Sequence, residues 1–251
     1  MNNKNQSSLK FVLALAGFLI LIMLAACTSE PPAPTATPIP PTPTPDPAAI
    51  VRDAGAAMSD LDSVRFAISR TGGPAFVDAN NQFSINEAIG IYSAPASAAA
   101  ELDVSGMGLN IKVQTIAIED EQWLTNFLTQ QWEKLPDSIG FNPADIFSAS
   151  GFEAIFDSNV TNVSPMRTET IDGVELTAID VVVEGDQVSA VTAGAAASDQ
   201  PVELTVWIDR DAGVIHQVEF ETPSSTDEVT HWLLKFSEFN EPVEINSPIG
   251  Q

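Results

Sequence analysis

The chain has 251 residues, 44% of them hydrophobic, which is enough for one large or two small globular domains. Its formal net charge of −24 argues against nucleic acid and against anionic lipid headgroups as direct electrostatic partners. The single cysteine excludes a disulfide framework and any paired-cysteine metal or redox site. The fold must therefore be held together by its hydrophobic core.

The N-terminus has the features of an export signal. Two lysines precede an apolar run at 11–24, which is too short for the roughly 20 residues of a membrane-spanning helix. The run ends in Leu24-Ala25-Ala26-Cys27, which resembles the bacterial lipobox, a motif whose cysteine receives a diacylglycerol and a further acyl chain. We predict a signal peptide over 1–26 and a lipid anchor on Cys27, on the outer face of the cytoplasmic membrane. A plain secretory signal with a free cysteine is the alternative.

A Pro/Thr/Ala-rich segment follows the cysteine. Its prolines remove amide donors and fix φ, so we expect residues 27–47 to form an extended tether. At about 3.1 Å per residue the tether could hold the next domain roughly 50 Å from a membrane. We expect one folded domain over 48–251.

The folded domain begins with a predicted helix over 49–61, with Asp46 and Pro47 as its cap and first turn. Alternating apolar residues then predict short antiparallel strands, and the turn residues of 209–213 predict a β-hairpin. Ile116 and Ile118 alternate on the opposite parity from Leu109, Ile111 and Val113, which suggests a bulge or turn between them. The strand patterns cover 64–68, 83–91, 98–104, 109–118, 174–183, 202–208, 214–220 and 232–239.

Helical signals interrupt the strands. Asn142 and Pro143 predict a helix start, and Gly151 is expected to divide this segment into two short helices. A third short helix is expected over 186–194. Strands with a few helices indicate an α+β or mostly-β architecture. The segment after Pro143 has a strongly apolar face made of Ile146, Phe147, Phe152, Ile155 and Phe156.

No catalytic or metal-binding pattern occurs in the sequence. Hydrolase, zinc-protease and phosphate-loop motifs are absent. His216 lies on an apolar strand face, and neither it nor His231 has partners at ligand spacing. The acidic turn at 209–211 lacks the further ligands of a calcium loop. We therefore predict no enzyme activity and no metal or cofactor.

Tryptophans make two predicted strands apolar on both faces. Trp207 and Trp232 alternate with apolar neighbours of the other parity. An ordinary antiparallel sheet buries one face and exposes the other to water. Either the core is simply thick, or helices cover one face while other apolar material covers the second.

The order of several motifs resembles the mycobacterial LppX/LprA/LprF/LprG lipoprotein family. The segment 201–209, the hairpin after it, and 234–245 resemble the family's closing strands. The resemblance covers most of 49–248. Further matches, in chain order, are Leu61 to Phe66, Ala94 to Ala98, Trp132 to Pro136, Phe141 to Phe147, Gly151-Phe152 and Gly173 to Leu176.

The resemblance implies a strongly curved antiparallel β half-barrel of about ten strands, similar to LolA and LolB. It also implies helices packed on the concave face, enclosing an apolar cavity that takes up acyl chains of a lipid or glycolipid. Such proteins carry lipids and catalyse nothing. The acidic excess, the long tether and a loop at 71–81 depart from the pattern and leave the lipid's identity open.

The leading hypothesis is a membrane-anchored lipid carrier or chaperone. The alternative is an envelope adaptor that binds a protein partner, such as a membrane transporter, and has no cavity. The sequence leaves open the lipid, its direction of movement, the transporter and the oligomeric state. For a carrier, the expected cavity lining, each residue of which could instead be plain core, is Leu102, Val104, Leu109, Ile111, Val113, Ile146, Phe147, Phe152, Ile155 and Phe156.

Overall fold

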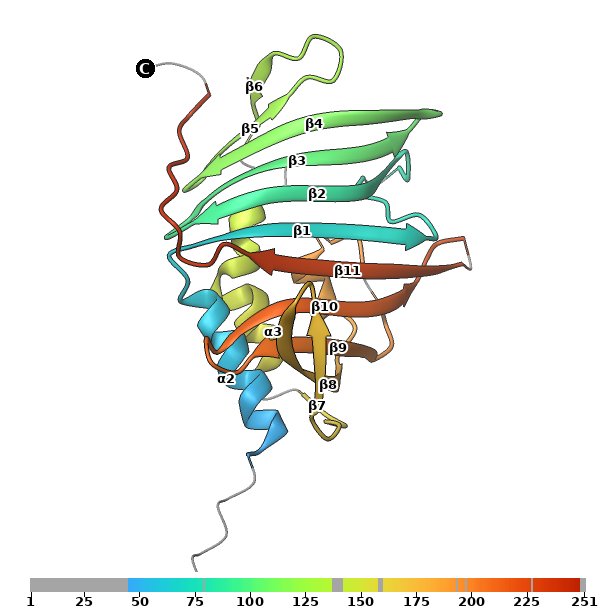
Figure 1. Ribbon diagram of the computed structural model, residues 1–251. Coiled ribbons are helices and arrows are strands. Elements are labelled where there is room, and N and C mark those ends of the chain that lie inside the picture. The colour runs from blue at the N-terminus through green and yellow to red at the C-terminus, as the bar shows by residue number, and fades with distance from the viewer. Residues whose placement is uncertain are drawn as a thin grey trace, which may run out of the picture. The chain divides into compact units, whose positions relative to one another are not determined.

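A computed structural model describes residues 45–78, 80–136, 142–157, 160–192, 194–196, 198–226 and 228–248 (Figure 1). The predicted signal peptide, Cys27, the tether up to residue 44 and Phe141 lie outside the described residues. Residues 45–251 form one compact unit, and the whole described hydrophobic core lies within it.

Eleven antiparallel strands form one curved, open sheet, in the order β6-β5-β4-β3-β2-β1-β11-β10-β9-β8-β7. Because β1 pairs with β11, the sheet consists of an N-terminal wing, β1–β6, and a C-terminal wing, β7–β11. This confirms the predicted curved antiparallel fold. The strands are β1 (Ser63–Gly72), β2 (Phe83–Ser93), β3 (Ser97–Gly106), β4 (Leu109–Ile118), β5 (Glu121–Thr125), β6 (Trp132–Lys134), β7 (Arg167–Ile171), β8 (Val174–Val183), β9 (Val202–Asp209), β10 (Val214–Pro223) and β11 (Val229–Ser237).

The helices lie on one side of the sheet, its concave side (Figure 1). Helix α2 contacts β9 and β10, whereas η1 contacts β2 and β3. The predicted cap is present at α2, where the Asp46 carboxylate accepts from the Ala48 amide at 3.1 Å. The helices are α2 (Pro47–Ser59), η1 (Pro143–Phe147), η2 (Ala149–Glu153), α3 (Ala154–Phe156) and η3 (Gln187–Val191).

The break at Gly151 is confirmed, and it has a steric cause. The residue has non-helical dihedrals, φ −93° and ψ −115°. A Cβ at this position would lie only 2.0 Å from the Ile146 carbonyl oxygen. Only glycine therefore allows η1 and η2 to fold against each other at this point.

The prediction of a bulge or turn near Ile116 was wrong. Strand β4 runs without interruption and pairs with β3 in a single register, so Ile116 and Ile118 simply lie on the convex face. The register shifts occur elsewhere, between Ile85 and Glu87 and between Ile215 and Gln217. The second bulge contains His216 and turns it out of the regular alternation of β10.

The last strand is shorter than predicted, because it ends at Ser237. Glu238 and Asn240 have positive φ values of 52° and 57°, which an extended strand cannot accommodate. Phe239 lies beyond the strand, with its ring centroid 4.9 Å from that of His216.

An aromatic cluster forms the centre of the concave core. The ring of Phe147 lies 4.7 Å from Tyr92, 5.8 Å from Phe66 and 6.0 Å from Phe236, and Phe152 lies 5.1 Å from Phe236. All five side chains are at most 3% exposed. Burial of each side chain stabilises the fold by roughly 1.5–3 kcal/mol. The contacts within the cluster join the helical segment after Pro143 to the middle of the sheet.

Trp207 and Trp232, whose strands have apolar residues on both faces, lie on opposite faces of the sheet. Trp232 belongs to the concave core, and its indole nitrogen donates to the Thr222 hydroxyl at 3.1 Å. Trp207 lies on the convex face and donates to Glu169 Oε2 at 2.8 Å. It packs there with Leu176, Ala178 and Ile171. A small second cluster on the convex face therefore explains why the pattern of β9 is apolar on both faces.

Candidate functional site

An apolar hollow of about 410 Å³ lies between η1 and the concave face of the sheet. We call it the trench. Six neighbouring strands, from β11 through β1 to β5, contribute to its floor, and η1 and three loop positions complete the lining. The lining residues are Phe66, Ile68, Val77, Ile85, Ala88, Ala100, Leu102, Val104, Thr115, Leu124, Leu135, Pro143, Ile146, Thr192 and Trp232.

The trench offers a ligand almost nothing but hydrocarbon. Its lining includes no charged side chain, and its two hydroxyls donate within the protein. Thr115 donates to the Trp123 carbonyl at 3.1 Å, and Thr192 donates to the Val188 carbonyl at 2.9 Å. A polar ligand would lose its hydrogen bonds to water in this site without replacing them, whereas an aliphatic chain loses none.

The trench is closed at one end and open at the other. Trp232, on β11, is 2% exposed, and Phe66 on β1 is 1% exposed. Leu124 and Leu135, at and beyond β5, are only partly buried. Val77, on the β1–β2 connection, is 43% exposed and marks a second opening, along the side of the trench where β1 and β2 are joined. The hollow is thus open to solvent, unlike the enclosed cavity that the sequence led us to expect.

Arg70 fixes the loop that carries Val77. Partial burial lowers the pKa of its guanidinium below the usual value, but an arginine keeps its charge. Each of its N–H groups is used to hold the β1–β2 connection in place. The acceptors lie at 2.6–3.1 Å and are the carbonyl oxygens of Gly72, Gly73 and Ile85, the Ser84 hydroxyl and the Asn86 amide oxygen.

The residues predicted to line a cavity fall into three groups. Leu102, Val104 and Ile146 line the trench. Ile111 and Val113 are half-buried and pair across the sheet with Val104 and Leu102, on the same face, while Leu109 is 60% exposed at the rim. A contact of this second group with ligand stays a prediction. The third group lies fully buried in the core and consists of Phe147, Phe152, Ile155 and Phe156.

Sequence reasoning missed several lining positions. Phe66, Ile68 and Trp232 were recognised as apolar strand residues, but nothing in their alternation distinguishes a trench wall from packed core. Leu124 lies on β5, which is too short to give a clear alternating pattern. Val77 and Thr192 come from connections, where periodicity carries no signal.

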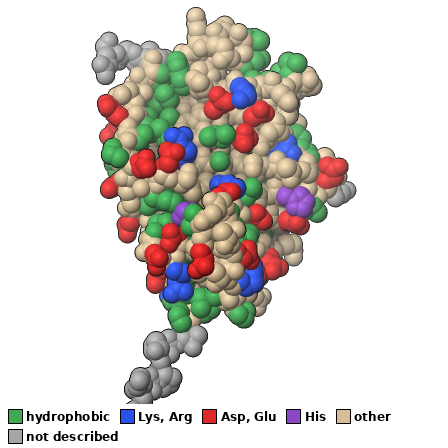
Figure 2. Space-filling view, in the orientation of Figure 1, with side chains coloured by type: hydrophobic (Ala, Val, Ile, Leu, Met, Phe, Trp, Pro, Cys, Tyr) green, Lys and Arg blue, Asp and Glu red, His purple; other side chains and the backbone are tan. Residues whose placement is uncertain are grey.

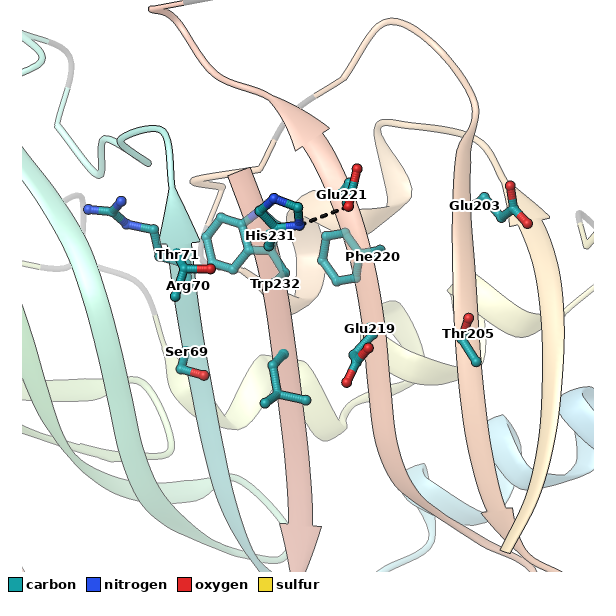
Figure 3. A pocket seen from close by; sticks show the side chains of 11 residues that line it. Ser69, Arg70, Thr71, Glu203, Thr205, Glu219, Phe220, Glu221, His231 and Trp232 are labelled. Carbon is teal, nitrogen blue, oxygen red and sulfur yellow. Dashed lines mark ion pairs between the residues drawn. The ribbon is translucent and has the colours of Figure 1, made fainter. Parts of the chain in front are cut away.

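A larger groove, of about 490 Å³, lies on the convex face, and its chemistry is different (Figure 3). Glu203, Glu219 and Glu221 line it, and His231 Nδ1 lies 2.8 Å from Glu221 Oε1. Within the described ranges no three His, Cys, Asp or Glu side chains are grouped to hold a metal ion. We consider the trench the better candidate site, because the groove is shallow, polar and strongly acidic.

Comparison with known proteins agrees with this architecture. LprF from Mycobacterium bovis superposes with a TM-score of 0.67 at 14% identity, covering 83% of this chain and 100% of LprF. LppX from Mycobacterium tuberculosis gives 0.57 at 23% identity, covering 80% and 98%. A LolA superfamily protein from Nitrosomonas europaea gives only 0.31 at 10% identity, covering 80% and 96%, so the shared fold rests on the two mycobacterial structures.

No curated protein sequence matches the chain significantly. No helix within the described part of the chain is long and apolar enough to cross a membrane. The family model described as LppX_LprAFG lipoprotein matches residues 46–245, which span the whole sheet and all five helices of the described unit. The chain therefore belongs to the LppX_LprAFG lipoprotein family.

Proposed function

We propose that this protein binds an acyl chain of a lipid or glycolipid in the trench and carries or shields that lipid in the cell envelope, without catalysis. In this proposal Cys27 bears the lipid anchor and holds the protein on the extracytoplasmic face of the membrane. The observation that carries the proposal is the trench, whose lining has no charged side chain and no free hydroxyl donor.

The energetics of such a site favour exchange with a bilayer. Shielding apolar surface from water contributes about 25 cal/mol per Å². A chain that moves from a bilayer to the trench leaves one apolar environment for another, so the transfer is close to neutral. A carrier needs this balance, because a ligand bound too tightly could not be released.

Native mass spectrometry tests the proposal directly. A soluble form comprising residues 28–251, which contains the whole compact unit from Pro45, is purified from its own host. We expect a bound population heavier by the mass of a lipid, which organic extraction removes. Repeated absence of any lipid from folded protein would contradict the proposal.

The anchor is tested separately by Cys27→Ser in the full-length chain. A serine cannot receive the thioether-linked diacylglycerol, so we expect an uncleaved precursor. Normal maturation of the variant, with retention in the membrane fraction after a salt wash, would contradict anchoring through Cys27.

One observation favours the alternative, a protein-binding adaptor. Ile91, Ala99, Ile116 and Trp123 form a cross-strand row on the convex face, and Ile89 beside it is 44% exposed. Figure 2 shows hydrophobic side chains gathered over this part of the sheet. A fluorescent fatty acid separates the two functions: saturable binding supports the carrier, and no binding to folded protein supports the adaptor.

A further inference from the structure

We infer that the trench takes a single acyl chain, which lies across the strands with its methyl end against Trp232 and its head at the β5–β6 hairpin. The ligand class is then a single-chain amphiphile, such as a fatty acid or a lysophospholipid. This inference rests on the proposed acyl-binding function and specifies how many chains enter, in which direction, and which residue limits their length.

The volume sets the number of chains. The trench measures about 410 Å³. A methylene is close in size to a water molecule, whose share of liquid volume is about 30 Å³, so the trench accommodates roughly 14 methylenes. Two chains of ordinary membrane-lipid length would need about twice the available space. Because the hollow is open to solvent, most of a second chain would lie outside it and remain in contact with water.

The topology sets the direction of the chain. The lining residues come from β11, β1, β2, β3, β4 and β5, which are consecutive neighbours in the sheet. Adjacent strands lie about 4.8 Å apart, so the trench extends roughly 24 Å across the sheet. A fully extended acyl chain of the size that fits by volume covers about three quarters of this span, and the span itself is shorter on the concave side of the curved sheet.

Trp232 forms the closed end, and it is held there rigidly. Its ring stacks on Phe220, with centroids 6.0 Å apart and planes 15° apart. Its indole nitrogen donates to the Thr222 hydroxyl at 3.1 Å. A side chain held on one face and at its polar edge cannot rotate away to admit a longer chain, so it acts as a stop.

The polar head remains at the open end. The two hydroxyls in the lining already donate to backbone carbonyls, so none is free to bind a headgroup inside. Leu124 and Leu135, which line the trench at the β5–β6 hairpin, are partly exposed. A headgroup placed there keeps its contact with water, which a buried one would lose.

The test is displacement of a fluorescent probe, cis-parinaric acid, from the soluble form comprising residues 28–251. Competitors are saturated fatty acids and lysophosphatidylcholines of 8–20 carbons, and diacyl phosphatidylcholines with the same chains. We expect affinity to rise about fourfold per methylene, equivalent to about 0.8 kcal/mol, up to an optimum and then to fall. We expect each diacyl lipid to bind at least tenfold more weakly than its single-chain counterpart.

Trp232→Leu should move the optimum to longer chains, because it removes the stop. The matched control is Trp207→Leu, since Trp207 is also buried and also donates to a side chain, but on the convex face; its optimum should not move. Trp232→Phe is made in parallel, because it retains an aromatic ring beside Phe220 if the leucine variant does not fold.

The outcomes separate the two proposals. Equal affinity for single-chain and diacyl lipids would overturn the single-chain inference but leave acyl binding intact. An unchanged optimum in folded Trp232 variants would overturn the assigned direction. If the probe does not bind at all, the proposed function fails together with the inference.

Discussion

The two wings of the sheet have similar strand patterns but different concave faces. In the C-terminal wing, Val181, Val206 and Ile208 are at most 1% exposed beneath the helices. In the N-terminal wing, Ala100 and Val104 are 8% and 9% exposed and line the trench, and the same face continues to Leu109, which is 60% exposed. Alternation decides which face of a strand is apolar, but the helices opposite decide whether that face becomes core or trench.

Close packing between α2 and α3 helps to explain why the helices enclose the concave face of the C-terminal wing more fully than that of the N-terminal wing. At Gly55 in α2, an added Cβ would lie 2.8 Å from Phe156 Cβ, so glycine lets α2 approach α3 closely. Helix α2 then packs on β9 and β10. In the apolar segment after Pro143, Ile146 therefore lines the trench, whereas Phe152 and Phe156 are buried in the core.

The largest expected effect is in the packed core. Phe152→Ala should lower the free energy of unfolding by about 3–5 kcal/mol, because it removes a fully buried ring and leaves a void among Phe147, Phe156 and Phe236. Urea unfolding of the soluble form measures this loss. Phe127→Ala, at a 40% exposed position, is the control and should cost much less. Equal losses would contradict the distinction between core and surface.

A pair of identical substitutions compares the two wings directly. Val181→Trp overfills the packed wing and should cost about 1–3 kcal/mol or more. Val104→Trp places the same indole in the trench, so we expect little loss of stability and loss of fatty-acid probe binding. Thermal unfolding and probe titration measure both quantities. If Val104→Trp destabilises as strongly and folded protein still binds the probe, the trench is not the site.

Much of the fold could be predicted from the sequence, because local chemistry determines it. The cap at Asn142, where the side chain accepts from the Ala144 amide at 2.9 Å, and the hairpin between β9 and β10 follow from short-range rules. Strand parity likewise placed Leu102 and Val104 on the concave face. No bounds were predicted for β5, β6 and β7, because segments of three to five residues give too little periodicity.

The candidate site was harder to predict, because it depends on long-range packing. Part of the apolar face after Pro143 was expected to line a cavity and the rest to pack on the sheet, but the sequence did not indicate which residues do which. Ile146 lines the trench, and Phe147, Phe152, Ile155 and Phe156 are buried in the core. No local pattern shows how a helix is rotated over a sheet that is assembled from the rest of the chain. The positions of Val77 and Thr192, on connections, depend on tertiary structure alone.

A smaller effect, dependent on pH, is expected in the C-terminal wing. Burial lowers the pKa of His216 below its usual 6.5, and nearby Asp209 offsets this only in part. The folded state therefore takes up the proton less readily than the unfolded state. This favours folding above pH 6.5, and the contribution is lost as the pH falls below 6.5 towards the folded pKa.

His216→Gln should make stability fall less steeply between pH 6.5 and 5, by about 1 kcal/mol or less over that interval. Thermal unfolding at a series of pH values measures the slope. An unchanged slope in His216→Gln would show that burial of this histidine does not affect stability.

The smallest effect on stability is expected at the rim of the N-terminal wing, where two leucines share one face. Leu109→Ser should change the free energy of unfolding by no more than about 0.5 kcal/mol, because the side chain is already 60% exposed. Leu102→Ser, made in the trench lining, should reduce the affinity for a fatty-acid probe more than Leu109→Ser does. The two leucines lie on neighbouring strands and project from the same face, but only Leu102 lines the trench. An equal or larger loss at Leu109 would extend the binding surface along Ile111 to the end of the sheet.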